Sequence, residues 1–436
     1  CLILSLAVGA LPAVLADDTP AVPQSAYPWL SECSEDLTGE TITLYHFGDL
    51  SGAYAFITQP IIAGLEDSIT LMNGNGGICG ATVAQEFRDT GGDTEQSQAF
   101  WDEFSAREDA YMIYLYASAD GELLLKQAEE AGIVLLNAAG SELALYGEEG
   151  QPSVQYTALP LYVDQLGAFC DYVGENWASM GMEGDPVIGH LSWEGAFGRS
   201  SDTDATRAYC EAAGVGYAGA EYFLPTTSDI APQLQTLVGN GANIIYTTSL
   251  ASGPAQIAGT VAALELNVLV SGVNWALDTS VIGLGGEATN GITGNLPFLW
   301  WDEIAEPGVQ KVVNYWLENR MAVDPEAAVR VRNIAYITSF GILDLWAEAM
   351  IQTINRVGYA NLSGEALDET FSALQYDAFD GLLPVDFTDG KRSGSSTRIG
   401  QIQFVESDSG VTPSVVPLTD WFTVPDLKVG GADVPQ

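Results

Sequence analysis

The feature that most constrains this chain is an alternation of apolar runs and amphipathic stretches that occurs twice. In the first array, residues 41–47 and 111–116 have the composition of β-strands, and residues 57–73 and 121–131 have the pattern of helices. Strands that are apolar throughout and separated by helices indicate a parallel sheet covered on both faces. Because the alternation restarts after Pro160, we predict two α/β lobes instead of one long sheet.

The second array has the same organisation as the first. We predict helices and strands in alternation over residues 164–179, 187–192, 204–213, 220–223, 230–238, 243–247, 255–264 and 268–271. After residue 291 the pattern changes to long helical stretches, followed by a strand-and-turn segment over residues 382–427. In the first array, Asp93 is placed to cap the N-terminus of a helix and Gly132 to end one.

The charge balance excludes several kinds of partner. Of 436 residues, 58 are acidic and 14 are basic, so the net charge is −44 with both histidines neutral. A phosphate backbone is bound by lysine and arginine, which displace its counterions, and an anionic membrane also attracts basic residues. We therefore expect no nucleic-acid partner. The hydrophobic fraction of 47% indicates a folded chain, not an acidic disordered one.

The first residues predict export from the cytoplasm. Residues 2–16 are uncharged and mostly apolar, end in small residues and are followed by Asp17 and Asp18, as in a secretory signal peptide. The run is too short to span a membrane. We interpret residues 1–16 as a signal-peptide remnant and residues 17–37 as a tether. Lipid attachment at Cys1, and with it membrane anchoring, stays open; the expected location is the periplasm or the cell surface.

The remaining cysteines agree with an oxidising compartment because their number is even. They are Cys33, Cys79, Cys170 and Cys210. Three pairings are possible, and four free thiols are a further alternative. Cys33 and Cys79 each precede one of the first two predicted strands, and Cys170 and Cys210 lie in helices that flank a third. We favour Cys33–Cys79 and Cys170–Cys210.

Catalytic signatures are missing from the sequence. It contains no phosphate-binding loop, dinucleotide fingerprint or nucleophile elbow, and no C-x-x-C or H-E-x-x-H motif. Its two histidines, His46 and His190, lie inside predicted strands, where a buried structural role is the expectation. We therefore predict that the protein is not an enzyme and uses no cofactor or metal.

Five segments occur in an order that points to one family. They are GDLSG (48–52), NGNGGICG leading to RDTGGD (73–93), YASADGELLLKQAEEAGI (116–133), LNAAGSEL (136–143) and AFGRS (196–200). Together they resemble motifs of the type I periplasmic substrate-binding proteins of ABC transporters, in the branched-chain amino acid (Leu/Ile/Val) binding family. The resemblance covers about residues 38–425.

The resemblance implies an α/β Venus-flytrap fold, in which two doubly wound parallel-sheet lobes are joined by three hinge crossings. We place the crossings near Ala158, Gly291 and Pro384. The first lobe is then residues 38–158 plus 292–384, the second is 159–291 plus 385–425, and 426–436 form a tail.

The implied function is capture of a small polar or amphipathic solute, such as an amino-acid-like molecule, an amide or a small carboxylate. The solute would then pass to the permease subunits of an ABC importer. A ligand sensor on the same fold is one alternative, and an extracellular structural subunit that assembles with itself is another.

The resemblance also implies which residues line the cleft. Ser118 matches the family serine that holds a ligand carboxylate. Gly140 stands where the family has a threonine, so Ser141 is a candidate replacement. The other expected lining residues are Tyr54, Ala139, Tyr156, Glu194, Phe197, Ser252, Asn274 and Trp275.

One position departs from the family's amino-acid binders. Ser252 stands where those proteins carry the acid that pairs with the ligand ammonium. A buried ammonium without a counter-charge is costly. Either Glu194 or Asp278 supplies the acid, or the ligand is not an α-amino acid.

Overall fold

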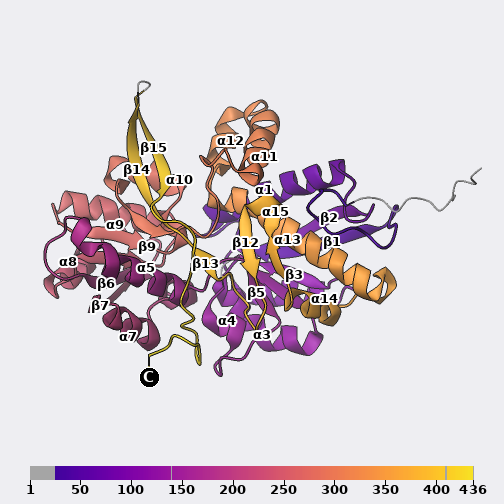
Figure 1. Ribbon diagram of the computed structural model, residues 1–436, viewed down its shortest axis with the longest axis horizontal. Helices are drawn as coiled ribbons and strands as arrows, with labels where there is room; N and C mark the ends of the chain where they lie inside the picture. The colour runs from indigo at the N-terminus through magenta and orange to yellow at the C-terminus, as the bar shows by residue number, and fades with distance from the viewer. Residues whose placement is uncertain (1–24, 139, 408–409, 436) are drawn as a thin grey trace, which may run out of the picture.

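The computed structural model describes residues 25–138, 140–407 and 410–435, and the chain forms two α/β lobes side by side (Figure 1). The predicted signal-peptide remnant and Cys1 lie outside the described residues. The first lobe has a five-stranded parallel sheet of order β2-β1-β3-β4-β5. Its strands are β1 (Thr41–Gly48), β2 (Thr82–Asp89), β3 (Met112–Leu115), β4 (Val134–Asn137) and β5 (Gln155–Thr157).

Helices cover both faces of this first sheet. Tyr45 and Phe47 of β1 pack on one face with Phe104 of α2, whereas Leu44 faces the cluster that contains α1 and α13. The strand is buried on both sides, which explains why apolar side chains face both helical layers. The helices of the lobe are α1 (Ala55–Gly74), α2 (Thr94–Ser105), α3 (Ser118–Ala131), α4 (Glu142–Tyr146), α13 (Ile334–Val357) and α14 (Gly364–Phe371).

Two local predictions for this lobe are confirmed. Asp93 caps α2 by accepting from the Glu95 N–H, and Gly132 ends α3 in the left-handed conformation with φ of 63°. Helix α13 is long and apolar enough to cross a membrane, but its apolar window is entirely buried in the protein. It is the core helix of the lobe.

The second lobe has a seven-stranded sheet of order β15-β14-β10-β9-β8-β6-β7. Its five parallel strands are β6 (Val187–Trp193), β7 (Gly216–Phe223), β8 (Ile244–Thr247), β9 (Leu269–Gly272) and β10 (Thr293–Asn295). The hairpin of β14 (Ile399–Ser407) and β15 (Gly410–Pro417) joins the edge antiparallel to β10 and projects away from the lobe (Figure 1). Its helices are α5 (Tyr162–Asn176), α6 (Ala196–Arg199), α7 (Asp204–Ala212), α8 (Ala231–Gly239), α9 (Ser252–Ala263) and α10 (Thr279–Gly285).

The chain passes between the lobes along three segments. β5 ends at Thr157 in the first sheet, and α5 begins at Tyr162 in the second lobe. β10 keeps the chain in the second sheet as far as Asn295, and Ser393 lies beside Thr157 on the final passage. The remaining elements include α11 (Pro307–Trp316), α12 (Pro325–Val331) and α15 (Ala378–Gly381), which contact the first lobe's helices α1 or α13, and two short antiparallel pairs. The pairs are β11 (Gln375–Asp377) with β12 (Leu383–Asp386) and β13 (Ser396–Thr397) with β16 (Phe422–Thr423).

The described start of the chain, residues 25–37, packs on the first lobe. Trp29 Nε1 donates to both carboxylate oxygens of Asp344 in α13, at 3.0 and 3.2 Å. The Ser31 N–H donates to Glu348 of the same helix at 2.8 Å. Buried carboxylates therefore hold this segment against the core helix.

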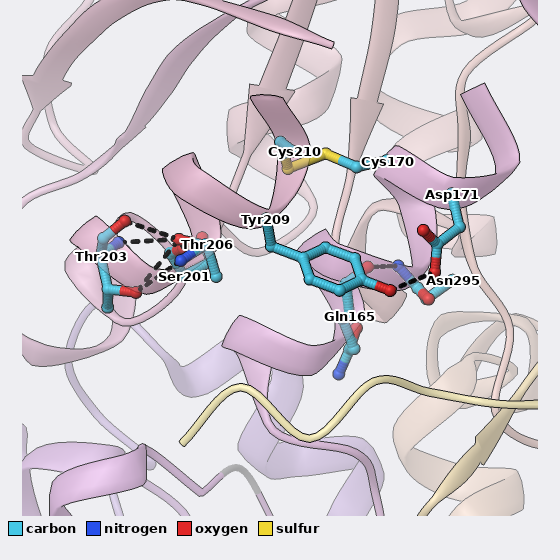
Figure 2. Close-up of a disulfide and its surroundings, with 9 residues drawn as sticks. All are labelled: Gln165, Cys170, Asp171, Ser201, Thr203, Thr206, Tyr209, Cys210 and Asn295. Atoms are coloured by element: carbon cyan, nitrogen blue, oxygen red, sulfur yellow. Dashed lines mark hydrogen bonds between the residues drawn. A yellow bond between two sulfur atoms is a disulfide. The ribbon is translucent and has the colours of Figure 1, made fainter. Parts of the chain in front are cut away.

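The structure contains the two favoured disulfides, Cys33–Cys79 and Cys170–Cys210. Figure 2 shows the second of them joining α5 to α7. Beside it, the Tyr209 hydroxyl of α7 donates to Asp171 of α5 at 2.9 Å. The two helices are thus linked covalently and by a hydrogen bond on the same face of the lobe.

We expect the double variant Cys170→Ser, Cys210→Ser to lose about 2–4 kcal/mol of unfolding free energy, because the bridge closes a loop with a sequence separation of 40. Urea denaturation followed by circular dichroism measures the loss. The wild-type protein without reductant is the control, and an unchanged midpoint would contradict the expectation.

Candidate ligand-binding cleft

A cavity of about 240 Å³ lies between the lobes, where strand ends from both sheets converge. In parallel α/β sheets, the loops that follow the carboxyl ends of the strands form the binding crevice. The first lobe contributes the loops after β1, β2, β3 and β4, and the second lobe contributes those after β6, β8 and β9. The residues that line the cavity include Asp49, Tyr54, Thr90, Thr94, Tyr116, Ser118, Asp120, Glu194, Ala196, Phe197, Leu250 and Trp275.

Aromatic rings form much of the wall and contact one another across the lobes. Tyr54 of the first lobe meets Trp193 of the second edge to face, with ring centroids 5.8 Å apart. Phe197 packs against Tyr162 at 5.2 Å, and Trp275 Nε1 donates to the Tyr162 hydroxyl at 3.0 Å. These contacts give the cavity a rigid apolar side.

Carboxylates occupy another part of the wall. Asp49 is buried and accepts hydrogen bonds from the backbone N–H groups of Gly52 and Tyr54. Asp120, which is 5% exposed, lies in the first turn of α3. Burial raises the pKa of Asp120 to about 6; a Ser97 hydrogen bond opposes this shift, and the Asp49 charge adds to it. Glu194 is exposed and pairs with Arg199 at 3.5 Å.

Two helices begin at the cavity without a side-chain cap. They are α1, which follows Tyr54, and α3, which follows Ala117. N–H groups at helix starts carry partial positive charge and favour nearby carboxylates. Asp49 accepts from one of them, the Tyr54 N–H at the start of α1, and no lysine, arginine or histidine is among the described residues that line the cavity.

The structure brings five of the expected lining residues together at this cavity: Tyr54, Ser118, Glu194, Phe197 and Trp275. Ser118 and Tyr54 come from the first lobe, and the other three come from the second. They lie on the two opposing sets of strand-end loops.

The structure places the other first-lobe residues of the expected set elsewhere. The Tyr156 hydroxyl donates to Asp368 at 2.6 Å within the lobe, and its ring packs on Phe371. Ser141 caps α4 and donates to Glu122 at 2.6 Å. Gly140 is closely packed within the lobe, because a Cβ atom at this position would clash with the Leu145 side chain. Ala139 lies outside the described residues.

The remaining second-lobe residues of the expected set are not among the residues that line the cavity. Ser252 is the first residue of α9, and Asn274 accepts a hydrogen bond from Gln165 at 3.0 Å. Asp278, one of the two acids considered as a counter-charge, accepts from the Ile334 N–H at the start of α13, at 3.1 Å. Its carboxylate thus accepts a hydrogen bond from a backbone N–H at the start of α13.

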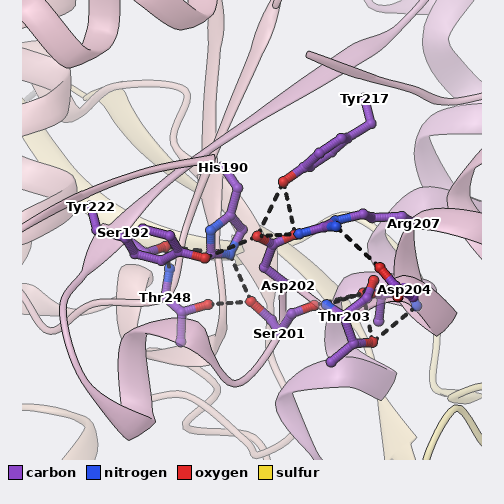
Figure 3. Close-up of polar contacts among 11 residues, drawn as sticks. His190, Ser192, Ser201, Asp202, Thr203, Asp204, Arg207, Tyr217, Tyr222 and Thr248 are labelled. Carbon is purple, nitrogen blue, oxygen red and sulfur yellow. Dashed lines mark hydrogen bonds and ion pairs between the residues drawn. The ribbon is translucent and has the colours of Figure 1, made fainter. Parts of the chain in front are cut away.

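Both histidines are buried, as expected for structural side chains. Desolvation lowers the pKa of His46 to about 3 and that of His190 to about 4, so both are neutral near pH 7. Figure 3 shows His190 beside Ser201, whose hydroxyl lies 2.8 Å from Nε2 and 2.5 Å from the Thr248 hydroxyl. This network holds the segments that lead into the lining residues of the second lobe.

Sequence reasoning missed the two buried acids of the cavity, although both stand in segments that carried the family resemblance. Asp49 lies in GDLSG, at the position where the family segment that it resembles (G-P-[LM]-S-G) has a proline, and Asp120 follows Ser118 by two residues. The available signal was an acidic side chain at a position where the family has proline, the residue whose backbone conformation is fixed.

The chain belongs to the periplasmic binding protein family, whose model matches residues 41–410. This is a family of binding proteins, not of enzymes. Membership implies a location outside the cytoplasm, and the two disulfides agree with it. A search of curated protein sequences finds no match.

Solved structures share the fold at low sequence identity. A branched-chain amino acid ABC transporter protein from Thermus thermophilus with bound valine has 18% identity and a TM-score of 0.72, covering 88% of this chain and 98% of its own. A fatty acid ABC transporter substrate-binding protein from Thermomonospora curvata has 18% identity and a TM-score of 0.71 (93% and 98% covered). An R. palustris solute-binding protein in complex with 4-hydroxybenzoate has 14% identity and a TM-score of 0.68 (88% and 98% covered).

We expect Asp120→Asn to stabilise the ligand-free protein near neutral pH. Since the folded-state pKa lies above the usual value, the folded protein binds the Asp120 proton more tightly than the unfolded chain does. This stabilising contribution is full below about pH 4 and is lost as the pH rises through about 6. The variant should therefore gain about 1–3 kcal/mol at pH 7.5 and almost nothing at pH 4.

Denaturant unfolding at both pH values measures the difference. Glu130→Gln is the matched control, because it removes one exposed charge from the same helix. A gain of equal size at both pH values would contradict the assigned cause.

Proposed function

We propose that this protein is the extracytoplasmic solute-binding component of an ABC importer, which captures a small amphipathic solute between its lobes and passes it to a permease. The observation that carries the proposal is the cavity between the lobes, to which both contribute lining residues. A solute seated there favours the closed arrangement because only that arrangement offers it both walls. The ligands named for similar structures, valine and 4-hydroxybenzoate, are small solutes of this kind.

The size and lining of the cavity support a small solute. Its volume of about 240 Å³ is below the roughly 300–1,000 Å³ of drug-sized sites. Tyr54, Phe197 and Trp275 supply apolar surface, and Ser118 and Thr90 supply hydroxyl groups. The three chain passages between the lobes, which we place at residues 158–161, after Asn295 and around Ser393, would act as the hinge.

A library of amino acids, amines, aromatic acids and short fatty acids tests the proposal. We expect at least one class to raise the melting temperature and to reduce the radius of gyration in small-angle scattering, as lobe closure requires. Stabilisation by no member would contradict the proposed function.

We expect Ala196→Trp to abolish this stabilisation at an unchanged fold, because the added ring fills the cavity from the second lobe. The affinity for any solute found in the screen should fall at least tenfold, measured by isothermal titration calorimetry. Ala106→Trp, at an exposed position, is the matched control. Undiminished binding by Ala196→Trp would place the ligand elsewhere.

A further inference from the structure

We infer that the solute carries a protonated nitrogen, seated against the carboxylates of Asp49 and Asp120, on an apolar body that fills the aromatic side of the cavity. The inference rests on the proposed function and names the chemical class of its ligand. It follows from where the cavity places charge.

The first step is the charge of the lining. Asp49, Asp120 and Glu194 line the cavity, and no lysine, arginine or histidine does so among the described residues. Glu194 is exposed and has Arg199 as its partner, whereas Asp49 and Asp120 are buried. The buried part of the cavity is thus anionic, and a ligand with a net negative charge would be repelled there.

Burying two carboxylates at one cavity costs free energy. Both acids line the same cavity; burial raises the pKa of Asp120, and the charge of Asp49 adds to that rise. Backbone N–H groups at the start of α1 satisfy Asp49, but they leave its negative charge in place. A ligand cation in the cavity offsets both the repulsion between the two carboxylates and the cost of their desolvation. The two buried acids are therefore more favourable when a cation occupies the cavity than when none does.

The third step is the shape of the complementary ligand. The aromatic residues Tyr54, Tyr116, Phe197 and Trp275 line the same cavity, and cations are attracted to the faces of such rings. An amine with an aryl or branched alkyl body satisfies the carboxylates and the apolar wall together. Asp49 and Asp120 of the first lobe then take the role of the acid that the family's amino-acid binders carry in the second lobe, at the position of Ser252.

A matched set of probes tests the inference on the mature protein. We choose 2-phenylethylamine, phenylalanine, 3-phenylpropionate and 2-phenylethanol, which share a ring and a short chain and differ in charge. We expect 2-phenylethylamine and phenylalanine to bind at least tenfold more tightly than the acid and the alcohol, as measured by calorimetry at pH 7.5. Within that pair, tighter binding of phenylalanine would indicate a zwitterionic ligand, and tighter binding of 2-phenylethylamine would indicate a simple amine.

A second set with isoamylamine, leucine, 4-methylpentanoate and isoamyl alcohol covers a branched alkyl body. An acid-only probe that binds as tightly as its amine counterpart would overturn the inference while leaving the proposed function intact. Stabilisation by no probe in either set and by no member of the wider library would instead contradict the proposed function.

Two variants assign the amine preference to the acids. Asp120→Asn and Asp49→Asn should each reduce the preference for amine over alcohol at least tenfold, with little effect on binding of the alcohol itself. Because Asp49 also bonds the start of α1, Asp120→Asn carries the test if the Asp49 variant fails to fold. Glu130→Gln, exposed on the same helix as Asp120, should keep the wild-type preference. An unchanged preference in Asp120→Asn would overturn the assignment.

Discussion

The structure depends on one geometric constraint: strands of a parallel sheet all end at the same edge. Each lobe therefore collects the loops after its strands at one edge, and the two edges face each other across the cavity. Asp49, Thr90 and Ser118 follow different strands and lie far apart in sequence, yet this rule brings them to one wall. The starts of α1 and α3 come to the same place, because each helix begins where a strand has ended.

Charge in this protein serves two separate purposes. Most of the 58 acidic side chains give the net charge of −44 and are compatible with a soluble protein outside the cell. A few are buried and fixed by the fold. Asp344 holds the first described residues to α13, and Asp278 serves the start of that helix. Asp49 and Asp120 are also buried, but they lie at the cavity and are the acids that a cationic solute would meet.

Much of the architecture could be predicted because its signals are local. The apolar runs, the N-cap at Asp93 and the left-handed Gly132 each depend on a few neighbouring residues. The disulfide pairing could be favoured because it followed from the order of strands and helices. The lining of the cavity was harder to predict. Ser118 and Phe197 could be identified from their positions in the family motifs, whereas Tyr156 and Asn274 form hydrogen bonds within the fold. Whether a side chain at a strand end points to a cleft or to its own lobe depends on packing partners more than a hundred residues away.

The sequence by itself determined that the chain builds two α/β lobes, because alternation and motif order are properties of the chain alone. Only the tertiary structure decided the charge of the cleft. The sequence contains a serine, Ser252, where an acid was expected, and it offers many acids elsewhere. Asp49 and Asp120 become neighbours only when β1 and β3 pair side by side, since that pairing sets the distance between their charges.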